Sequence, residues 1–157
     1  MAIVIAAPAS GSGKTLVSLA LLSWARARGE SIQPFKVGPD YLDPQLLSEA
    51  AGRSCRNLDL NLCGEPWVRK AFHGYGGGCS MALIEGVMGL FDGIGSTEDG
   101  STAAIARLLD LPVILVVDAG GQAASLGALV RGFRDHDPTL NVAGVVINRV
   151  NSDRHRA

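Results

Sequence analysis

The sequence predicts an α/β fold in which a mostly parallel sheet is covered by helices on both faces. Short, continuously apolar segments alternate with helical patterns along the chain. Strands that are apolar on both sides belong in a sheet with both faces covered, and strand–helix alternation is typical of parallel strands. The chain has 157 residues, 47% of them hydrophobic, which is enough for one core, so we expect one domain over residues 1–157.

The expected strands are aliphatic runs at residues 2–7, 31–37, 81–85, 113–118 and 142–148. The expected helices lie at residues 14–28, 44–51, 65–73, 101–110 and 121–135. Pro34 has no N–H to donate to a neighbouring strand, so the strand at 31–37 is expected near an edge of the sheet. Trp24 and Trp67 fall on helical patterns and are expected to pack into the core.

Charge and composition give no sign of a nucleic-acid or membrane partner. The formal net charge is −1 and no basic run is present. No apolar run reaches the roughly 20 residues of a membrane span, and residues 2–7 lack the basic flank of a signal peptide. We therefore expect a cytoplasmic protein with no nucleic-acid partner and no membrane partner. The three cysteines form no C-x-x-C pair and are expected to be reduced thiols.

The stretch P-A-S-G-S-G-K-T, residues 8–15, nearly matches the phosphate-binding pattern G-x-x-x-x-G-K-[ST], with Pro8 in place of the first glycine. A strand enters the stretch and a helix leaves it, as a phosphate-binding loop requires. Lys14 can reach the β- and γ-phosphates of a nucleotide, and the Thr15 hydroxyl can bind Mg²⁺. The expected nucleotide-binding residues here are Gly11, Ser12, Gly13, Lys14 and Thr15. The predicted fold is thus of the P-loop NTPase type.

Carboxylates follow two further strands at the same expected edge. In K-V-G-P-D-Y-L-D-P, residues 36–44, Asp40 and Asp43 lie just beyond a strand, and Glu85 ends the strand at 81–85. Ligands bind at the carboxyl ends of parallel strands, and the two aspartates there suit either Mg²⁺ coordination or a cationic partner. The alternative for the first stretch is a solvated turn rich in proline and aspartate. The expected metal ligands are Thr15, Asp40 and Glu85.

A long irregular segment follows Glu85. It contains E-G-V-M-G-L-F-D-G, residues 85–93, with Asp92 inside it, and continues to Ser101. Irregular segments of that length in compact domains are often lids or substrate loops. Ser101 or Thr102 is expected to cap the next helix.

Two strand-ending positions complete the expected site. For Asp118, a helix cap and a phosphate-site role stay equally open. Asn148 ends the final strand, where a nucleotide base can lie.

Together these motifs, with V-I-N-R-V at residues 146–150, resemble the N-terminal domain of the cobyrinic acid a,c-diamide synthases, which is related in fold to dethiobiotin synthetase. The resemblance covers essentially the whole chain, in order. It implies ATP- and Mg²⁺-dependent amidation of the a and c side-chain carboxylates of a corrinoid in cobalamin biosynthesis, through an acyl phosphate. Lys14, Asp40 and Glu85 would then be catalytic and Asn148 would contact adenine. The substrate contacts implied are Tyr41, Leu42, Asp43 and Asp92.

The resemblance also implies a second domain. Ammonia would come from glutamine, hydrolysed in a C-terminal amidotransferase domain that is absent from this chain, so we expect no activity with glutamine here. The stretch N-S-D-R-H-R-A, which follows the final strand, reads as the start of a helix, so the sheet domain is expected to be incomplete at its C-terminus. A sheet face left uncovered there would favour a homodimer.

Two alternatives stay open. A nickel-sirohydrochlorin a,c-diamide synthase would share the same motifs. A partitioning-type ATPase switch is the alternative from another class, although Ala9 stands where that group carries an extra lysine.

Overall fold

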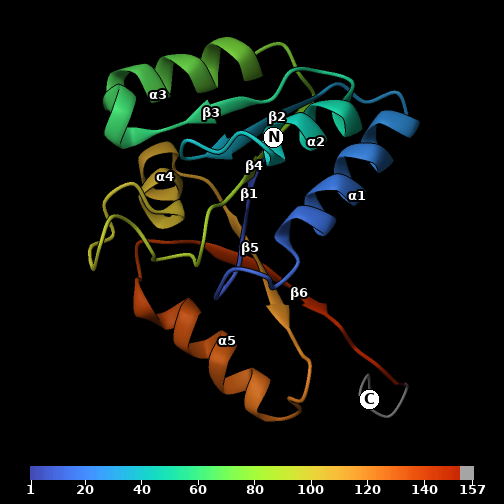
Figure 1. Ribbon diagram of the computed structural model, residues 1–157, viewed down its shortest axis with the longest axis vertical. Helices are drawn as coiled ribbons and strands as arrows, with labels where there is room; N and C mark the ends of the chain where they lie inside the picture. Colours follow the sequence, from blue (N-terminus) through green and yellow to red (C-terminus); the bar gives the residue numbers. More distant parts are fainter. Residues whose placement is uncertain (153–157) are drawn as a thin grey trace.

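The computed structural model describes residues 1–152, in which six parallel strands form one sheet in the order β3-β2-β4-β1-β5-β6 (Figure 1). The strands are β1 (Ala2–Ala6), β2 (Ile32–Val37), β3 (Arg56–Leu58), β4 (Met81–Glu85), β5 (Val113–Asp118) and β6 (Val142–Asn148). The helices are α1 (Lys14–Ala27), α2 (Asp43–Ala51), α3 (Leu60–Gly76), α4 (Thr102–Leu109) and α5 (Ser125–His136). The predicted α/β class is confirmed.

Helices cover the sheet on both faces, as the continuous apolar strands predict (Figure 1). Leu22 of α1 and Leu47 of α2 pack with Ile5 on one face. Val68 of α3 belongs to the second cluster, on the other face, which also contains residues of α4 and α5. Val4 and Ile5 are adjacent in β1 and both are 0% exposed, so this central strand is buried from both sides.

The position of β2 in the sheet differs from the expectation. The three-residue strand β3, which the sequence analysis did not predict, pairs with β2 and makes β2 an interior strand. That pairing starts at Phe35, so Pro34 lies just before the ladder with β3 and needs no N–H there. The inference that Pro34 places its strand near an edge was therefore wrong.

Helix α3 begins earlier than predicted because Asp59 caps it. The Asp59 carboxylate accepts hydrogen bonds from the backbone N–H groups of Asn61 and Leu62, each at 2.9 Å. Gly64, at φ 75°, then breaks the helical path before Pro66, and the helix continues to Gly76. The helical spacing of apolar residues, from which the helix at 65–73 was predicted, therefore begins only after this kink.

The two tryptophans do not pack into the core, contrary to expectation. Trp24 is 57% exposed and Trp67 is 44% exposed. Strand β6 also keeps apolar side chains on the surface, with Val145 at 37% and Ile147 at 54% exposure. The helix predicted to start after β6 falls largely on residues 153–157, outside the described residues. None of the helices within residues 1–152 has the length and apolar character to span a bilayer.

Candidate functional site

The loop between β1 and α1 has the backbone geometry of an anion-binding turn. Gly11 and Gly13 adopt φ values of 80° and 101°, a region that favours glycine. The first turn of α1 has no side-chain cap, so its backbone N–H groups are free to face an anion. A Cβ atom on Gly13 would lie only 2.2 Å from Nδ2 of Asn148, so no larger residue fits without displacing that amide.

Lys14 is the first residue of α1 and is 8% exposed. Its Nζ donates a hydrogen bond to the carbonyl oxygen of Met88 at 2.6 Å. Met88 adopts φ 46°, so the loop after β4 turns sharply where it presents this carbonyl. Burial lowers the pKa of the Lys14 ammonium, as does the nearby ammonium of Lys36.

Lys36 connects the carboxylates that the sequence predicts at this edge. Its Nζ lies 2.8 Å from Oε1 of Glu85, 2.6 Å from Oδ2 of Asp43 and 3.6 Å from Oδ2 of Asp40. Lys36 is 3% exposed. Burial opposes its charge, but the Glu85 and Asp43 carboxylates outweigh that effect and raise the pKa of Lys36. The motifs alone predict no role for this lysine, although a lysine inside an apolar strand is itself a signal of a buried partner.

Glu85 is 0% exposed and has one oxygen available for a further partner. Oε1 accepts hydrogen bonds from Thr15 Oγ1 at 3.2 Å and from Lys36. Oε2 is buried and has no hydrogen-bond partner among the described residues. A buried, unpartnered carboxylate oxygen is costly, and a divalent cation is one group that would satisfy it.

The site does not form a metal cage from protein carboxylates alone. Within residues 1–152, no group of three or more His, Cys, Asp or Glu side chains is arranged to hold a metal ion. Mg²⁺ usually binds through one or two carboxylates and completes its shell with phosphate oxygens and water. The Thr15 hydroxyl and the Glu85 carboxylate, which lie 3.2 Å apart, fit that mode. The Asp40 carboxylate, 3.6 Å from Lys36 Nζ, could supply the second carboxylate.

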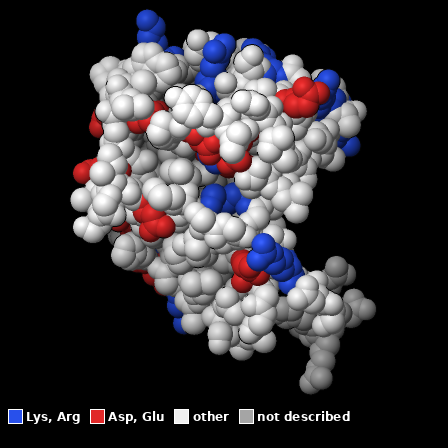
Figure 2. All heavy atoms as spheres, viewed as in Figure 1, with Lys and Arg blue, Asp and Glu red and all other residues white. Residues whose placement is uncertain are grey.

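These groups surround a cavity of about 340 Å³, which we call the phosphate pocket. Its lining residues are Ser10, Gly11, Gly13, Lys14, Thr15, Lys36, Asp40, Asp43, Gly86, Val87 and Met88. Two of them are lysines and two are aspartates. In Figure 2, basic atoms lie at the floor of a hollow in the middle of the molecule, with acidic atoms directly above it.

Asn148 lies against the phosphate-binding loop. Its Nδ2 donates to the carbonyl oxygen of Ser12 at 2.9 Å, and its Oδ1 accepts from the backbone N–H of Arg149. Arg149 donates to the carbonyl oxygen of Gly11 at 3.0 Å and forms an ion pair with Asp118. Asp118 therefore supports the loop through Arg149 and does not cap α5, which begins later, at Ser125.

The residues expected to contact a substrate fall into two groups. Tyr41 and Leu42 are exposed by 82% and 75% beyond the end of β2. Asp43 instead turns inward to Lys36 and lines the phosphate pocket. Asp92 accepts a hydrogen bond from the backbone N–H of Gly89 at 2.9 Å, so it shapes the loop after β4.

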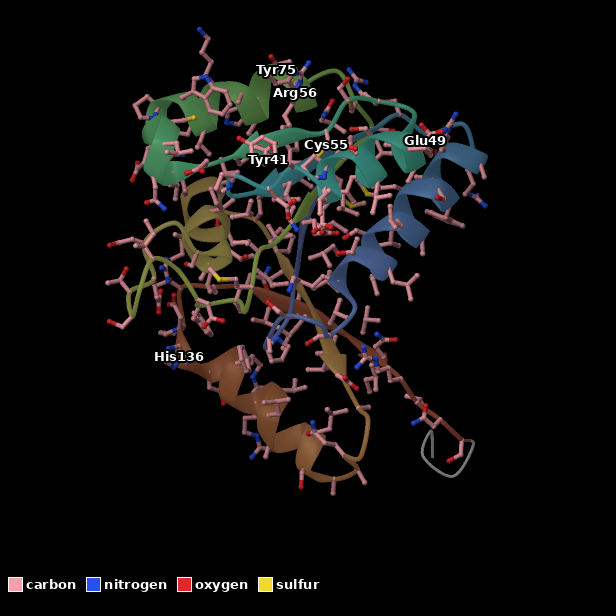
Figure 3. All side chains as sticks on the ribbon, viewed as in Figure 1. Tyr41, Glu49, Cys55, Arg56, Tyr75 and His136 are labelled. Carbon is pink, nitrogen blue, oxygen red and sulfur yellow. The ribbon has the colours of Figure 1, made fainter. Side chains whose placement is uncertain are left out.

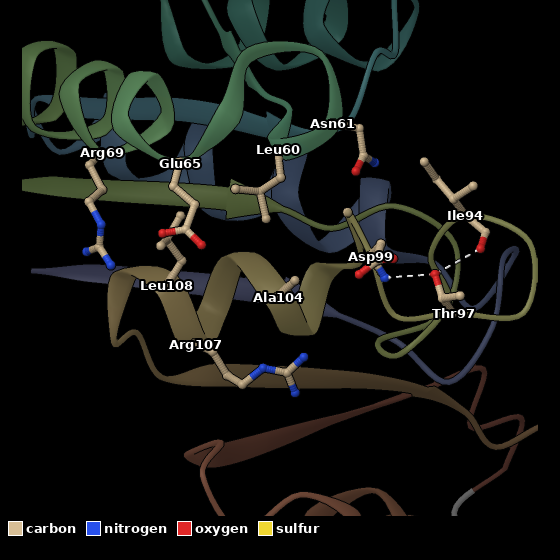
Figure 4. A pocket seen from close by; sticks show the side chains of 11 residues that line it. Leu60, Asn61, Glu65, Arg69, Ile94, Thr97, Asp99, Ala104, Arg107 and Leu108 are labelled. Atoms are coloured by element: carbon tan, nitrogen blue, oxygen red, sulfur yellow. Dashed lines mark hydrogen bonds between the residues drawn. The ribbon is translucent and has the colours of Figure 1, made fainter.

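The irregular segment 86–100 borders a larger, separate cavity of about 730 Å³, together with α3 and α4 (Figure 4). Ser101 accepts a hydrogen bond from the backbone N–H of Ala104 at 3.1 Å and so caps α4, as expected. Arg107 in this cavity forms ion pairs with Glu98 and Asp137. None of the predicted site residues lines this cavity, and the charge of Arg107 is already neutralised within the chain.

Curated proteins similar to this chain include two a,c-diamide synthases. The cobyrinate a,c-diamide synthase of Gloeobacter violaceus is 53% identical over 156 residues, which is 99% of this chain and 34% of that protein. The hydrogenobyrinate a,c-diamide synthase of Streptomyces coelicolor is 52% identical, over 99% of this chain and 32% of that protein. The resemblance seen in the motifs is confirmed, and the chain spans about a third of the length of these relatives.

Solved structures with a similar fold bind nucleotides. The signal recognition particle 54 kDa protein of Aeropyrum pernix in complex with GDP has a TM-score of 0.61 at 17% identity, covering 97% of this chain and 36% of that one. A nucleotide-binding protein of Archaeoglobus fulgidus in complex with ADP has a TM-score of 0.56 at 14% identity, covering 95% of this chain and 66% of that one. At such identities the likeness shows the fold alone.

The model of one protein family, described as the CobQ/CobB/MinD/ParA nucleotide binding domain, matches residues 3–157. That match includes the loop at 8–15 and all the strand-ending residues described above. The chain belongs to the CobQ/CobB/MinD/ParA nucleotide-binding domain family.

Proposed function

We propose that this chain is the ATP-binding domain of an amidoligase that converts the a and c side-chain carboxylates of cobyrinic acid, or of its metal-free counterpart, to amides. One observation carries the proposal: the phosphate-binding loop, Lys14 and Lys36 line one pocket at the carboxyl ends of the strands, and Lys36 is paired there with the buried Glu85. The names of the relatives at about 50% identity support the choice of substrate.

Mg²⁺ would be held by the Thr15 hydroxyl and the carboxylates of Asp40 and Glu85. The unpartnered Oε2 of Glu85 and its neighbour Thr15 support this assignment. When bound, the ion neutralises charge on the β- and γ-phosphates of ATP. Lys14 would exchange its hydrogen bond to the Met88 carbonyl for one to the phosphates, and the backbone N–H groups of Gly13 and its neighbours would hold the β-phosphate.

A carboxylate is a poor electrophile, so amide formation needs activation. In the proposed reaction, a carboxylate oxygen of the substrate bonds to the γ-phosphorus of ATP, the bond from that phosphorus to the bridging oxygen breaks, and ADP leaves. Ammonia then attacks the acyl carbon, loses a proton to solvent, and phosphate leaves with the oxygen that came from the carboxylate. Lys14 and Lys36 would stabilise the negative charge of the transferring group, and the rigid loop would position it.

Ammonia would be supplied from glutamine by an amidotransferase domain, as the resemblance implies, and the reaction would take place in the cytoplasm. A switch ATPase of the partitioning type lacks support from the sequence because Ala9 stands where that group carries its extra lysine. The nickel-sirohydrochlorin diamide synthases share the proposed chemistry and differ only in the tetrapyrrole.

The proposal is tested by supplying ammonia directly, which removes the need for glutamine. The protein is incubated with ATP, Mg²⁺, ammonium chloride and one tetrapyrrole at a time: cobyrinic acid, hydrogenobyrinic acid or nickel sirohydrochlorin. Mass spectrometry should detect a diamide of one corrinoid. If the substrate carboxylates carry oxygen-18, one label per amide should appear in the released phosphate. Label that stays out of phosphate would contradict the acyl phosphate, and ATP hydrolysis without any amide would favour the switch.

A further inference from the structure

A second pocket, of about 360 Å³, lies beside the phosphate pocket and is lined by aromatic side chains. We call it the aromatic pocket and define it by Asp40, Tyr41, Arg56, Cys63, Trp67 and Tyr75, which all line it. Its walls come from the loop after β2, from β3 and from α3. Asp40 lines both pockets, so a ligand in one reaches the rim of the other.

Three exposed aromatic side chains line the aromatic pocket. Tyr41, Trp67 and Tyr75 are 82%, 44% and 43% exposed. They are both tyrosines and one of the two tryptophans in the sequence. Large aromatic side chains gathered around one concave, exposed surface are typical of a binding site, because each offers a flat apolar face and a polar tip.

Arg56 adds a cation with no carboxylate partner. Its guanidinium lies 4.6 Å from the centre of the Tyr75 ring, in a cation–π contact (Figure 3). Among residues 1–152, no Asp or Glu forms an ion pair with Arg56. The two acidic residues of this pocket are committed elsewhere: Asp59 caps α3, and Asp40 accepts backbone hydrogen bonds from Leu42 and Asp43. The guanidinium is therefore available to an anionic ligand.

We propose that the aromatic pocket holds one edge of the tetrapyrrole and that Arg56 binds a carboxylate other than the one being activated. This inference rests on the proposed function. A planar guanidinium binds a carboxylate through two parallel hydrogen bonds, and flat conjugated rings pack on Tyr and Trp faces. A volume of about 360 Å³ admits an edge of a macrocycle with its side chain, and the rest of the ring extends toward Asp40.

The arrangement gives a physical basis for choosing among carboxylates. The substrate carries several similar carboxylate side chains, and the phosphate pocket alone has no means to distinguish them. Anchoring one carboxylate at Arg56 fixes which other side chain reaches Lys14 and the γ-phosphate. Arg56 is thus a positioning residue for selectivity and takes no part in phosphoryl transfer.

The test compares Arg56→Met with Arg53→Met, since Arg53 is a nearby exposed arginine outside the aromatic pocket. A charge-assisted bidentate contact is worth about 1.5–3 kcal/mol, so KM for the tetrapyrrole should rise about 10- to 100-fold in Arg56→Met. KM for ATP and the melting temperature should not change, and Arg53→Met should match wild type. Arg56→Lys should recover part of the affinity. The ratio of the two monoamide isomers should shift only in the Arg56 variants.

A measurement without turnover gives the second readout. Cys63 lines the aromatic pocket and is exposed, whereas Cys79 lies outside it. With a non-hydrolysable ATP analogue present, the tetrapyrrole should slow alkylation of Cys63 by iodoacetamide and leave Cys79 unaffected.

The outcomes separate the two proposals. If wild type forms the diamide but Arg56→Met keeps its KM and Cys63 stays unprotected, the aromatic pocket is not the substrate subsite, while the proposed function stands. If wild type amidates no tetrapyrrole, the proposed function fails and this inference fails with it.

Discussion

The phosphate pocket and the aromatic pocket share Asp40 but differ in how their side chains are held. At the phosphate pocket, the lining residues Lys14 and Lys36 and the adjacent Glu85 are almost completely buried, and each has at least one polar partner within the chain. In the aromatic pocket, Tyr41 and Arg56 are exposed, and the Arg56 guanidinium lies over the Tyr75 ring.

This difference reflects two physical requirements, one for a catalytic site and one for a site that binds a large ligand. A site that must stabilise charge during reaction benefits from groups fixed in advance, and burial fixes them at a cost in stability. A site that must bind a large, flat ligand benefits from open aromatic surface, and substitutions there disturb the fold little. Variants in the phosphate pocket should therefore change stability and ATP use, whereas variants in the aromatic pocket should change tetrapyrrole binding alone.

The largest expected effect is on catalysis in Lys14→Ala. Loss of a charge aimed at the transferring phosphoryl group should lower amide formation by about 10³-fold. Circular dichroism should be unchanged, because within residues 1–152 the Lys14 side chain loses a single hydrogen bond, the one to the Met88 carbonyl. The matched control is Lys70→Ala, an exposed lysine on α3. Equal turnover in the two variants would refute the role of the phosphate-binding loop.

The next effect is on stability, in Lys36→Met. Removing one partner of a buried ion pair leaves the Glu85 charge uncompensated and should cost about 3–5 kcal/mol in free energy of unfolding. Urea denaturation measures the loss. The double variant Lys36→Met/Glu85→Gln should lose less than the sum of the two single variants, because neither charge then remains alone. Strict additivity would mean that the two side chains do not interact in solution.

Gly13→Ala should have a smaller effect, on both stability and nucleotide affinity. A positive φ and the close approach of Asn148 should cost about 1–3 kcal/mol. Gly29→Ala is the control, because Gly29 also has a positive φ, 75°, but a Cβ added there would meet no atom within 4 Å. Isothermal titration with an ATP analogue should show weakened binding only for Gly13→Ala. Equal binding by both variants would indicate that the contact between Gly13 and Asn148 does not shape the nucleotide site.

The smallest effect on stability is expected for Tyr41→Ala. The side chain is 82% exposed, so the free energy of unfolding should change by less than about 0.5 kcal/mol. KM for the tetrapyrrole should nevertheless rise about three- to tenfold, the value of one aromatic contact, while KM for ATP stays constant. A rise in both constants would assign the loop to nucleotide binding instead, and the contrast between the two pockets would disappear.

Much of the fold was predictable because local patterns and tertiary burial agree. The strands at 81–85, 113–118 and 142–148 have the predicted bounds, since each is a continuous apolar run in a parallel sheet. Strand β3 escaped prediction because three residues carry no periodic signal. The start of α3 was missed because Gly64 and Pro66 interrupt its pattern.

The sequence could predict only those site residues whose positions follow from a motif or from the end of a strand. Lys14, Thr15, Asp40 and Glu85 follow strands or a known loop pattern, so topology brings them to one edge. The ion pairs of Lys36 depend on side-chain direction across neighbouring strands, and no local pattern encodes that. The aromatic pocket combines Tyr41, Arg56 and Tyr75 from three separate elements, one of them the unpredicted β3.

The hydrogen bond from Asn148 to the Ser12 carbonyl joins positions 136 residues apart. The phosphate-binding loop is made first on the ribosome, yet this bond forms only after β6 has been synthesised and has joined the sheet. Contacts of such long sequence separation form late in folding, because a large loop must close first. A nascent chain thus carries the complete loop sequence long before that loop is held in shape, so nucleotide binding should report that β6 has joined the sheet.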